Sequence, residues 1–489
     1  MSSTYVTVAI PYVNADPHLG YAYELVLADI YARSRRAAGD KVRFLGGTDD
    51  YSLKNVLAAE TAGQPTGQFV NQAAARFQAL TEPLGLSFDD YIRTSTDPRH
   101  RPAVHRIWQA AAGSGDLYQR HYEGDYCVGC EQFYDPSELE DGHCPEHRAA
   151  TERVTEENWF FRLSRFQDYL DDLISSDRLV IRPEPFRREA LAFIRAGLED
   201  ISVSRSIERA RGWGIPVPDD PAQVIYVWFD ALTNYISALG FGDPQSGDYQ
   251  QWWLDADHRI HVIGKGILRF HAIYWPAFLA SAGQPPPTRI QVHPYLTIDG
   301  HKISKSQGTT INPTELIDTY GVDALRWFFA RDVNNTVDTD FTTDRMTARA
   351  NDELANSIGN AANRLVTLAH RYLAATVAAQ PPLPELADLP QQVTDAISHF
   401  DLRAAAHLIA HAATTLNTHI SATEPWTIAK DPTRHTELSE LLGTHLASAR
   451  HIATALTPVL PDLATRLHHQ LGDPNQPLPQ PEPVYKRIT

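Results

Sequence analysis

The N-terminal part of the chain alternates short apolar runs with longer stretches of helical periodicity. Residues 4–13 are rich in β-branched and aromatic side chains, which favour a buried strand. Residues 19–38 have apolar positions at helical spacing and stop at Gly39, and residues 41–45 form a second apolar run. Strand, loop, helix and strand in this order predict a βαβ unit, and therefore a parallel sheet.

Later apolar runs predict three more strands, at residues 223–229, 259–264 and 289–292. Helical patterns are expected at residues 66–115, 267–281, 314–331 and 346–377. Residues 391–470 are rich in Ala, Leu and His and contain no predicted strand. The pattern therefore predicts an α/β domain followed by an α-helical bundle.

Length and composition limit the class of protein. A chain of 489 residues is expected to hold two to four domains. No apolar run reaches the roughly 20 residues that span a bilayer, and the N-terminus does not resemble a secretory signal. We therefore expect a cytoplasmic protein without a membrane partner. The net charge of −17 argues against a broad, unspecific nucleic-acid binder but leaves a local basic patch open.

The three cysteines lie close together in two short motifs, Cys127-x-x-Cys130 and Cys144-x-x-His147, separated by thirteen residues. This spacing predicts a tetrahedral Zn²⁺ site with three thiolates and one imidazole. Four protein ligands leave no open position, so the zinc would be structural. The alternative is a set of buried cysteines beside an unrelated histidine.

Two segments have the chemistry of a phosphate site. Lys302 and Lys305 lie among small hydroxyl residues and precede a glycine, as in a cationic loop that closes over a polyphosphate. A solvated basic turn is the alternative for this segment alone. His18 and Gly20 fall at the predicted N-terminus of a helix, where backbone amides and the helix dipole favour phosphate.

These two segments read PHLGY at residues 17–21 and KISKS at residues 302–306, and they resemble the HIGH and KMSKS signatures of class I aminoacyl-tRNA synthetases. Ordered matches over essentially the whole chain resemble the methionyl-tRNA synthetase family more closely. They include GGTDD at 46–50, YVWFDALTNYISALG at 226–240 and RFHAIYWPAFL at 269–279. The cysteine motifs are similar to those of the bacterial form with a single pair of zinc knuckles.

The resemblance implies a Rossmann-type parallel-sheet catalytic domain with a zinc-binding connective insertion, followed by a C-terminal α-helical bundle. The implied limits are residues 1–115 and 223–313 for the two catalytic halves, 116–222 for the insertion, 314–345 for a stem-contact region and 346–489 for an anticodon-binding bundle.

The resemblance also implies residue roles, with ATP and Mg²⁺ as co-substrate. His18, Lys302 and Lys305 would be catalytic, and Gly20, Tyr21, Gly264 and Gly266 would complete the ATP site. The amino-acid site would comprise Ile10, Tyr12, Asp49 for the ammonium group, Trp228, Ala231, Tyr235, Ile267, His271 and Trp275. Arg371 and Trp426 would contact an anticodon.

The chain departs from the family pattern in a few places. Tyr21 replaces the second histidine of HIGH, Tyr51-Ser52 replaces a His-Gly pair, and Gly266 replaces an aspartate. His293-Pro294 and residues 332–336 also differ. Most of these changes fall at the nucleotide and reacting-carboxylate end, whereas the zinc motifs and the side-chain pocket match.

Two functions follow from this mixture. The first is a diverted paralogue that activates methionine or a similar amino acid and passes it to a small-molecule acceptor. That acceptor would be, for example, a hydroxylamine in hydrazine or natural-product biosynthesis, with a separate cupin protein as partner. The alternative is a methionine–tRNA ligase that charges tRNA(Met), which Arg371 and Trp426 favour. The two lysines argue against a non-catalytic relative. We expect a monomer or a weak dimer.

Overall fold

The computed structural model describes residues 2–128, 132–134, 136–145, 148–243, 245–302, 311–474 and 476–489. The chain forms two compact units. Unit 1 contains Met1–Pro17, Lys41–Thr81 and Phe88–Pro294, and unit 2 contains His18–Asp40, Glu82–Ser87 and Tyr295–Thr489. No helix among the described residues is long and apolar enough to cross a membrane.

Unit 1 is built on a six-stranded parallel sheet, which confirms the predicted α/β class. Its spatial order is β3 (Asp90–Arg93), β2 (Lys41–Thr48), β1 (Ser3–Val8), β12 (His258–Gly264), β13 (Arg289–His293) and β7 (Val180–Arg182). Strands β2 and β3 lie on one side of β1, whereas β12, β13 and β7 lie on the other, so the order reverses between β1 and β12.

Helices and smaller sheets complete unit 1. The helices are α2 (Leu53–Thr61), α3 (Thr66–Ala79), α4 (His100–Gly113), α5 (Gln167–Ser175), α6 (Glu184–Arg195), α7 (Val227–Leu232), α8 (Asn234–Ser237), α9 (Gly247–Tyr249) and α10 (Trp275–Ser281), with helical turns η1 (Pro136–Glu138), η2 (Leu163–Phe166), η3 (Gln250–Leu254), η4 (Lys265–Ile267) and η5 (Phe270–Tyr274). A four-stranded sheet joins β5 (Gln132–Tyr134), β4 (Leu117–Cys127), β6 (Glu152–Phe161) and β8 (Ile201–Ser202), and a three-stranded sheet joins β10 (Pro216–Val217), β11 (Asp220–Ile225) and β9 (Ser204–Ser206).

Two predictions for unit 1 were wrong. The run at residues 223–229 is not one strand, because β11 stops at Ile225 and helix α7 begins at Val227. A short apolar run suits a buried helix as well as a strand, and most of α7 is buried. Residues 66–115 are not all helical, because Asp90–Arg93 forms edge strand β3, whose four residues are too few to show a period.

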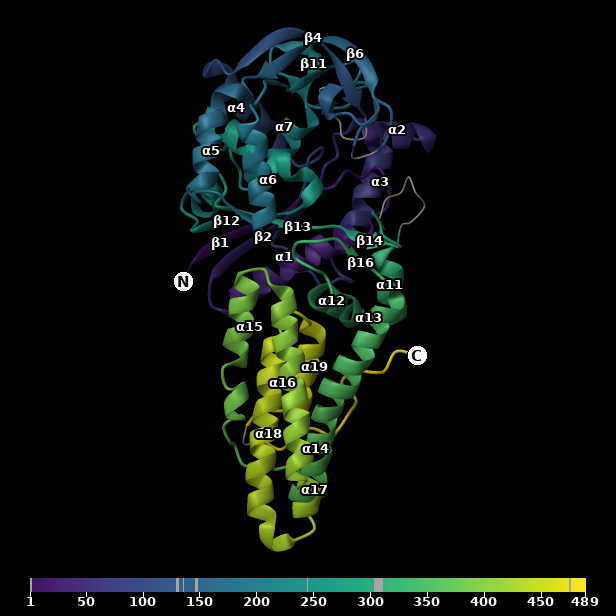
Figure 1. Ribbon diagram of the computed structural model, residues 1–489, viewed down its shortest axis with the longest axis vertical. Helices are drawn as coiled ribbons and strands as arrows, with labels where there is room; N and C mark the ends of the chain where they lie inside the picture. Colours follow the sequence, from purple (N-terminus) through teal and green to yellow (C-terminus); the bar gives the residue numbers. More distant parts are fainter. Residues whose placement is uncertain are drawn as a thin grey trace. The chain divides into compact units, whose positions relative to one another are not determined.

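Unit 2 is mainly helical, as predicted for its C-terminal part (Figure 1). Its helices are α1 (Leu19–Ala37), α11 (Pro313–Tyr320), α12 (Val322–Arg331), α13 (Thr343–Arg349), α14 (Asn360–Leu373), α15 (Leu389–Ser398), α16 (Leu402–Thr423), α17 (Pro425–Ile428), α18 (His435–Leu456) and α19 (Pro461–Leu471), with a π-helical segment η7 (Ala350–Gly359) and short 3₁₀ turns η8 (Pro384–Leu386) and η9 (Pro432–Arg434). A small sheet joins β15 (His301–Lys302), β14 (Leu296–Ile298) and β16 (Thr339–Asp340). Helix α18 packs against α14, α15, α16 and α19, so it is the centre of the bundle.

A buried ion pair ties α1 to the bundle inside unit 2. The guanidinium of Arg326 on α12, which is 1% exposed, donates to the carboxylate of Asp29 on α1 at 2.8 Å. It also donates to the carbonyl oxygen atoms of Leu84 and Val459. Burial alone would raise the pKa of Asp29, but Arg326 and Arg33 outweigh burial, so this pKa is lowered and the carboxylate stays charged.

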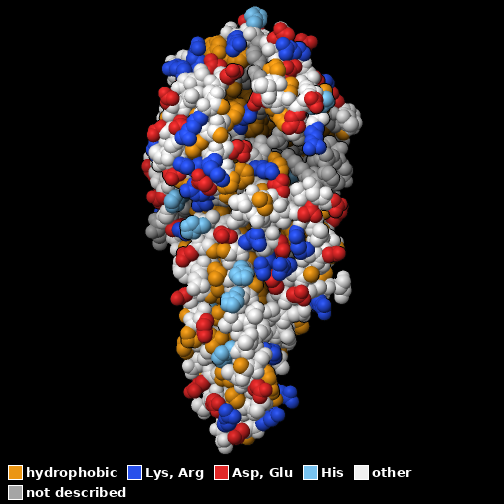
Figure 2. Space-filling view, in the orientation of Figure 1, with side chains coloured by type: hydrophobic (Ala, Val, Ile, Leu, Met, Phe, Trp, Pro, Cys, Tyr) orange, Lys and Arg blue, Asp and Glu red, His pale blue; other side chains and the backbone are white. Residues whose placement is uncertain are grey.

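Side chains of both charges are interspersed on the face shown in Figure 2, and histidines are visible along the bundle. The described side chains therefore form no broad basic surface on that face. Any contact with phosphates there depends on local groups of arginine or lysine.

Candidate amino-acid and nucleotide site

The reversal of strand order in unit 1 marks the place where ligands bind in open α/β sheets. Ile10 and Tyr12 follow β1, and Gly264 is the last residue of β12, the neighbouring strand. Gly266 and Ile267 come next, in η4. The fold therefore brings residues predicted for both the amino acid and ATP to the carboxyl ends of the two central strands.

Asp49 is held beside this reversal. It follows β2, pairs with Tyr12 in an isolated β-bridge and donates its backbone N–H to the carbonyl oxygen of Pro11 at 2.9 Å. Asp49 is 2% exposed, and its carboxylate accepts a hydrogen bond from the backbone N–H of Tyr51 at 3.2 Å. A buried carboxylate favours a cationic partner such as the substrate ammonium group.

The close approach at the end of β2 requires glycine. A Cβ atom on Gly47 would lie 2.4 Å from the carbonyl oxygen of Ile92 and 3.0 Å from Cγ2 of Ile10. Any side chain there would push β2 away from β3 and from Ile10. The GGTDD motif thus sets the position of Asp49 through its second glycine.

Aromatic side chains form a wall next to Asp49. The ring of Trp228 stacks on Phe270, with centroids 3.7 Å apart, and meets Tyr12 edge to face at 6.3 Å. Tyr235 lies 6.3 Å from Trp275, and Ala231 is buried on α7. Within the described part of the chain, the buried indole N–H groups of Trp228 and Trp275 have no hydrogen-bond partner, as expected where a ligand supplies one.

Tyr235 and His271 form the polar element of this wall. The Tyr235 hydroxyl and Nε2 of His271 are 2.7 Å apart, and Nδ1 of His271 is 2.9 Å from the carbonyl oxygen of Ile267. Nδ1 must donate to that carbonyl, so Nε2 is the acceptor and the tyrosine is the donor. Burial lowers the pKa of His271 to about 4, so the imidazole is neutral at physiological pH.

His261 was missed by the sequence analysis, although it supports Tyr235. Its ring stacks on Tyr235 at 4.0 Å, and its Nδ1 lies 2.7 Å from the Thr7 hydroxyl. The Tyr5 hydroxyl donates to the backbone carbonyl of Tyr235 at 2.8 Å. A lone histidine in an apolar strand gives no local signal, so only the fold shows this role.

A second missed pair fixes helix α7. Nε2 of His100 lies 2.5 Å from the carboxylate of Asp230, and Nδ1 lies 2.8 Å from the Ser237 hydroxyl. All three residues are fully buried, and burial raises the pKa of Asp230. This pair joins α4 to α7 and α8, which carry Trp228, Ala231 and Tyr235.

The predicted nucleotide residues His18, Gly20 and Tyr21 lie in unit 2. His18 is the N-cap of α1, and its Nδ1 accepts the backbone N–H of Tyr21 at 3.2 Å. The proton of a neutral ring is then on Nε2, which makes that nitrogen a donor suited to phosphate. A Cβ on Gly20 would lie 3.2 Å from the imidazole of His18, so glycine leaves room for the ring.

The segment that contains His18 meets the chain just after the KISKS segment inside unit 2. The backbone N–H of Leu19 donates to the carbonyl oxygen of Ile311, just beyond the KISKS segment, at 3.2 Å. The backbone of Lys302 ends strand β15, opposite Thr297. Lys305 lies outside the described residues.

Two departures from the family pattern have local structural roles. Ser52 is the N-cap of α2 and accepts the backbone N–H of Lys54. Tyr51 packs on Trp213, with centroids 5.5 Å apart, and the Trp213 indole donates to the carbonyl oxygen of Asp50 at 2.8 Å. These residues therefore stabilise the loop that carries Asp49.

Part of the predicted zinc site is visible. Cys127, at the end of β4, and Cys144 are buried in one small cluster with Tyr134 and Leu139. Cys130 and His147 lie outside the described residues. Two buried thiols in one cluster fit the donor set of a structural zinc site, while the described residues alone supply no group of three or more candidate ligands.

The predicted anticodon residues lie on separate helices of the bundle. Arg371 is near the C-terminus of α14, and Trp426 is on α17. The guanidinium of Arg364, which was not predicted, lies 6.0 Å from the Trp426 ring. Nε and one terminal nitrogen of Arg364 are buried without a hydrogen-bond partner among the described residues.

Comparison with known proteins agrees with this geometry. The sequence model of the family described as "tRNA synthetases class I (M)" matches residues 4–156 and 135–366. The chain is 40% identical to a methionine–tRNA ligase of Rickettsia conorii, over 96% of this chain and 93% of the relative. It is 38% identical to a methionine–tRNA ligase of Caldanaerobacter subterraneus, over 96% of this chain and 74% of the relative.

A solved structure gives the same result for the fold. Mycobacterium tuberculosis methionyl-tRNA synthetase in complex with methionyl-adenylate superposes with a TM-score of 0.93 at 35% identity, covering 100% of both chains. The free state of that enzyme gives a TM-score of 0.86 at 32% identity, covering 100% of this chain and 99% of the other.

Proposed function

The chain belongs to the class I methionyl-tRNA synthetases, and from this premise we propose that it activates methionine with ATP and transfers the methionyl group to tRNA(Met). The observation that carries the proposal for methionine is the Tyr235–His271 pair in an aromatic wall beside Asp49. An unbranched thioether suits such a wall, because sulfur makes favourable contacts with aromatic rings. A neutral imidazole avoids a buried charge next to it.

In the first step the methionine carboxylate attacks the α-phosphate of ATP, which gives methionyl adenylate and releases pyrophosphate. We assign Asp49 to the substrate ammonium group and His18 to the ATP phosphates, through its Nε2–H. Gly20, Tyr21, Gly264 and Gly266 complete the nucleotide site. Lys302 and Lys305 stabilise the charge that develops on pyrophosphate, and Mg²⁺ accompanies ATP. In the second step a terminal ribose hydroxyl of tRNA attacks the methionyl carbonyl and releases AMP.

For the acceptor, we choose tRNA over the small molecule expected from a diverted paralogue. The two curated relatives compared above are named methionine–tRNA ligases, and they match this chain nearly end to end. The local roles of Tyr51 and Ser52 explain two of the departures without new chemistry. Arg371 and Trp426 are the proposed anticodon contacts.

We also propose that Cys127, Cys130, Cys144 and His147 hold one structural Zn²⁺. Zinc would join these two cysteine motifs within the connective insertion, for which residues 116–222 remain the proposed limits. The prediction is one zinc per chain by elemental analysis, and loss of zinc in the Cys144→Ser variant. The absence of zinc in the purified wild-type protein would contradict the proposal.

Amino-acid-dependent ATP–pyrophosphate exchange tests the activation step. The proposal predicts robust exchange with methionine and little with leucine, isoleucine or glutamine. Exchange that prefers another amino acid, or no exchange, would overturn the assignment of the pocket.

A further inference from the structure

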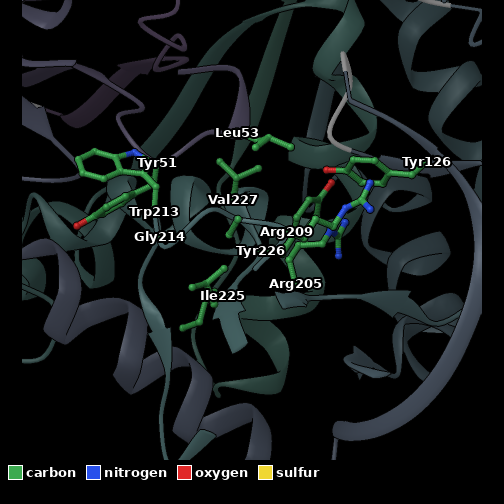
Figure 3. A pocket seen from close by; sticks show the side chains of 12 residues that line it. Tyr51, Leu53, Tyr126, Arg205, Arg209, Trp213, Gly214, Ile225, Tyr226 and Val227 are labelled. Carbon is green, nitrogen blue, oxygen red and sulfur yellow. The ribbon is translucent and has the colours of Figure 1, made fainter. Parts of the chain in front are cut away.

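Unit 1 contains a pocket beside the segments that carry the proposed amino-acid site. It has a volume of about 30 Å³ and is lined by Tyr51, Tyr126, Arg205, Arg209, Trp213 and Val227, among others (Figure 3). Tyr51 follows the Asp49–Asp50 pair directly, and Val227 precedes Trp228. The pocket therefore adjoins the predicted methionine site through two separate chain segments.

Two arginines form one side of this pocket. The guanidinium groups of Arg205 and Arg209 lie 5.2 Å and 4.3 Å from the ring of Tyr126. Arg205 also lies against Tyr226 at 4.4 Å and Phe133 at 4.9 Å. Figure 3 shows the two arginines near Tyr126, with Tyr51 and Trp213 at the opposite side of the pocket.

The hydrogen bonds of these arginines are incomplete. Arg205 is 6% exposed, and its described donor contacts go to the Ser202 and Ser204 backbone carbonyls and the Ser202 hydroxyl. Nε of Arg205 and Nε of Arg209 are buried and have no partner in the described part of the chain. A buried donor without a partner costs free energy, which a bound acceptor would recover.

The charges in the pocket are also unbalanced. None of the described residues that line it is acidic. Arg209 approaches Glu152 at 3.5 Å and Glu156 at 4.0 Å, outside the lining, and both distances exceed those of a strong ion pair. Two guanidinium groups with aromatic surroundings and no carboxylate among the described lining residues favour an anion. Arginine suits phosphate geometry in particular.

We propose that this pocket binds a phosphodiester group near the 3′ end of the tRNA and so places the terminal ribose at the adjacent methionyl group. This inference rests on the proposed function. About 30 Å³ gives room for roughly two water molecules, which the two non-bridging oxygens of a phosphodiester would replace. The rings of Tyr51 and Trp213 offer an apolar surface for a neighbouring base. Because the chain carries a net charge of −17, such local cations are needed to hold an RNA end.

The test uses the full-length protein, a tRNA(Met) transcript and single-turnover transfer of methionine from preformed enzyme-bound adenylate. Arg209→Met keeps an unbranched apolar side chain over Tyr126 but removes the charge, and Arg209→Lys keeps a charge. Arg153→Gln is the control, because Arg153 is an exposed arginine of β6 that pairs with Glu123 and Asp125 and is not among the residues that line the pocket.

We expect Arg209→Met to slow the transfer of methionine to tRNA, or to raise the KM for tRNA, by about tenfold. In methionine-dependent ATP–pyrophosphate exchange, the KM for ATP and the kcat should stay within about twofold of wild type. The salt dependence of the tRNA KM would fall by about 0.7 in log–log slope, as for one lost phosphate contact. Arg209→Lys would recover part of the loss, and Arg153→Gln would behave as wild type. Thermal unfolding of each variant controls for folding.

Three results would overturn the inference: an equal loss in Arg153→Gln, no change in transfer with Arg209→Met, or an effect confined to the KM for ATP. The last would assign the arginines to the ATP phosphates instead. If the wild-type protein does not charge tRNA at all, the proposed function fails first. Binding of a short RNA with the same 3′ end to wild type, but not to Arg209→Met, would then still support the pocket, and equal binding by both would reject it.

Discussion

The Tyr235 hydroxyl donates a hydrogen bond to Nε2 of His271 over 2.7 Å, inside an aromatic wall that neither residue could form alone. The tyrosine comes from α8 and the histidine from η5. Tyr5 and His261, which contact Tyr235, and Thr7, which bonds His261, come from β1 and β12, the strands at which the order of the sheet reverses. The position of this pair is therefore set by the sheet.

The Tyr235→Phe variant removes the donor and leaves the buried Nε2 of His271 unpaired. An unsatisfied buried acceptor costs about 1–3 kcal/mol, so we expect the KM for methionine in ATP–pyrophosphate exchange to rise about tenfold. Tyr249→Phe is the matched control, since it removes another tyrosine hydrogen bond of unit 1, to Gln284. Equal effects of the two variants on this KM would show that the Tyr235 hydroxyl has no special part in the pocket.

Acid should destabilise the protein through its buried histidines. The pKa of His271 and that of His445 are both lowered to about 4 by burial, whereas an unfolded histidine has a pKa of about 6.5. Between these values the unfolded chain binds more protons, so the free energy of unfolding falls as pH decreases from about 6.5 towards 4.

Each of these histidines is expected to contribute a loss of about 2 kcal/mol between pH 7.5 and pH 5. Urea unfolding at the two pH values measures it. The His271→Gln variant should be less stable at pH 7.5 but lose less stability on acidification. A pH dependence identical to that of wild type would mean that His271 does not titrate abnormally.

Gly47→Ala tests the close approach that positions Asp49. The added Cβ would lie 2.4 Å from the carbonyl oxygen of Ile92, so the end of β2 must shift. We expect a loss of about 1–3 kcal/mol in stability together with a higher KM for methionine. Gly113→Ala is the control, because nothing lies within 4 Å of the added atom. Unchanged thermal unfolding of Gly47→Ala would contradict the packing described here.

Arg326→Gln should be among the most destabilising single changes in unit 2. It leaves the buried carboxylate of Asp29 without its main cation, which typically costs about 3–5 kcal/mol. Arg434→Gln breaks an exposed pair with Glu437 and should cost less than about 1 kcal/mol. Comparable losses in chemical denaturation for the two variants would refute the distinction between buried and exposed pairs.

The sequence predicted the parallel sheet and the helical bundle well, because those features have a period. The structure brings residues named for the amino-acid site together, and their role there stays a prediction. Helix α1 was predicted from its apolar spacing, and its end was predicted from Gly39. In the structure this glycine has a positive φ of 90°, which glycine adopts readily. The motif matches named Tyr235 and His271 but could not show that one donates to the other. That hydrogen bond forms only where α8 and η5 meet in the fold, and the two segments are too far apart in the sequence for any local pattern to predict it.

Other features had no local signal. The apolar run before Asp230 predicted a strand. The structure has a helix there, fixed by the contact between Asp230 and His100, which lies 130 residues earlier in the sequence. Arg205, Arg209, Tyr51 and Tyr126 come from three separate segments, so their pocket could not be seen in the sequence. The acceptor was inferred less well: departures at Tyr51 and Ser52 suggested diverted chemistry, but they have roles in the fold.

The most direct test of the central claim is transfer of labelled methionine to a tRNA(Met) transcript by the purified enzyme with ATP and Mg²⁺, followed on acid gels. The account predicts that most of the transcript becomes charged, with methionine attached through a base-labile ester. Formation of methionyl adenylate without charging of tRNA, together with rapid transfer to added hydroxylamine compounds only, would contradict it.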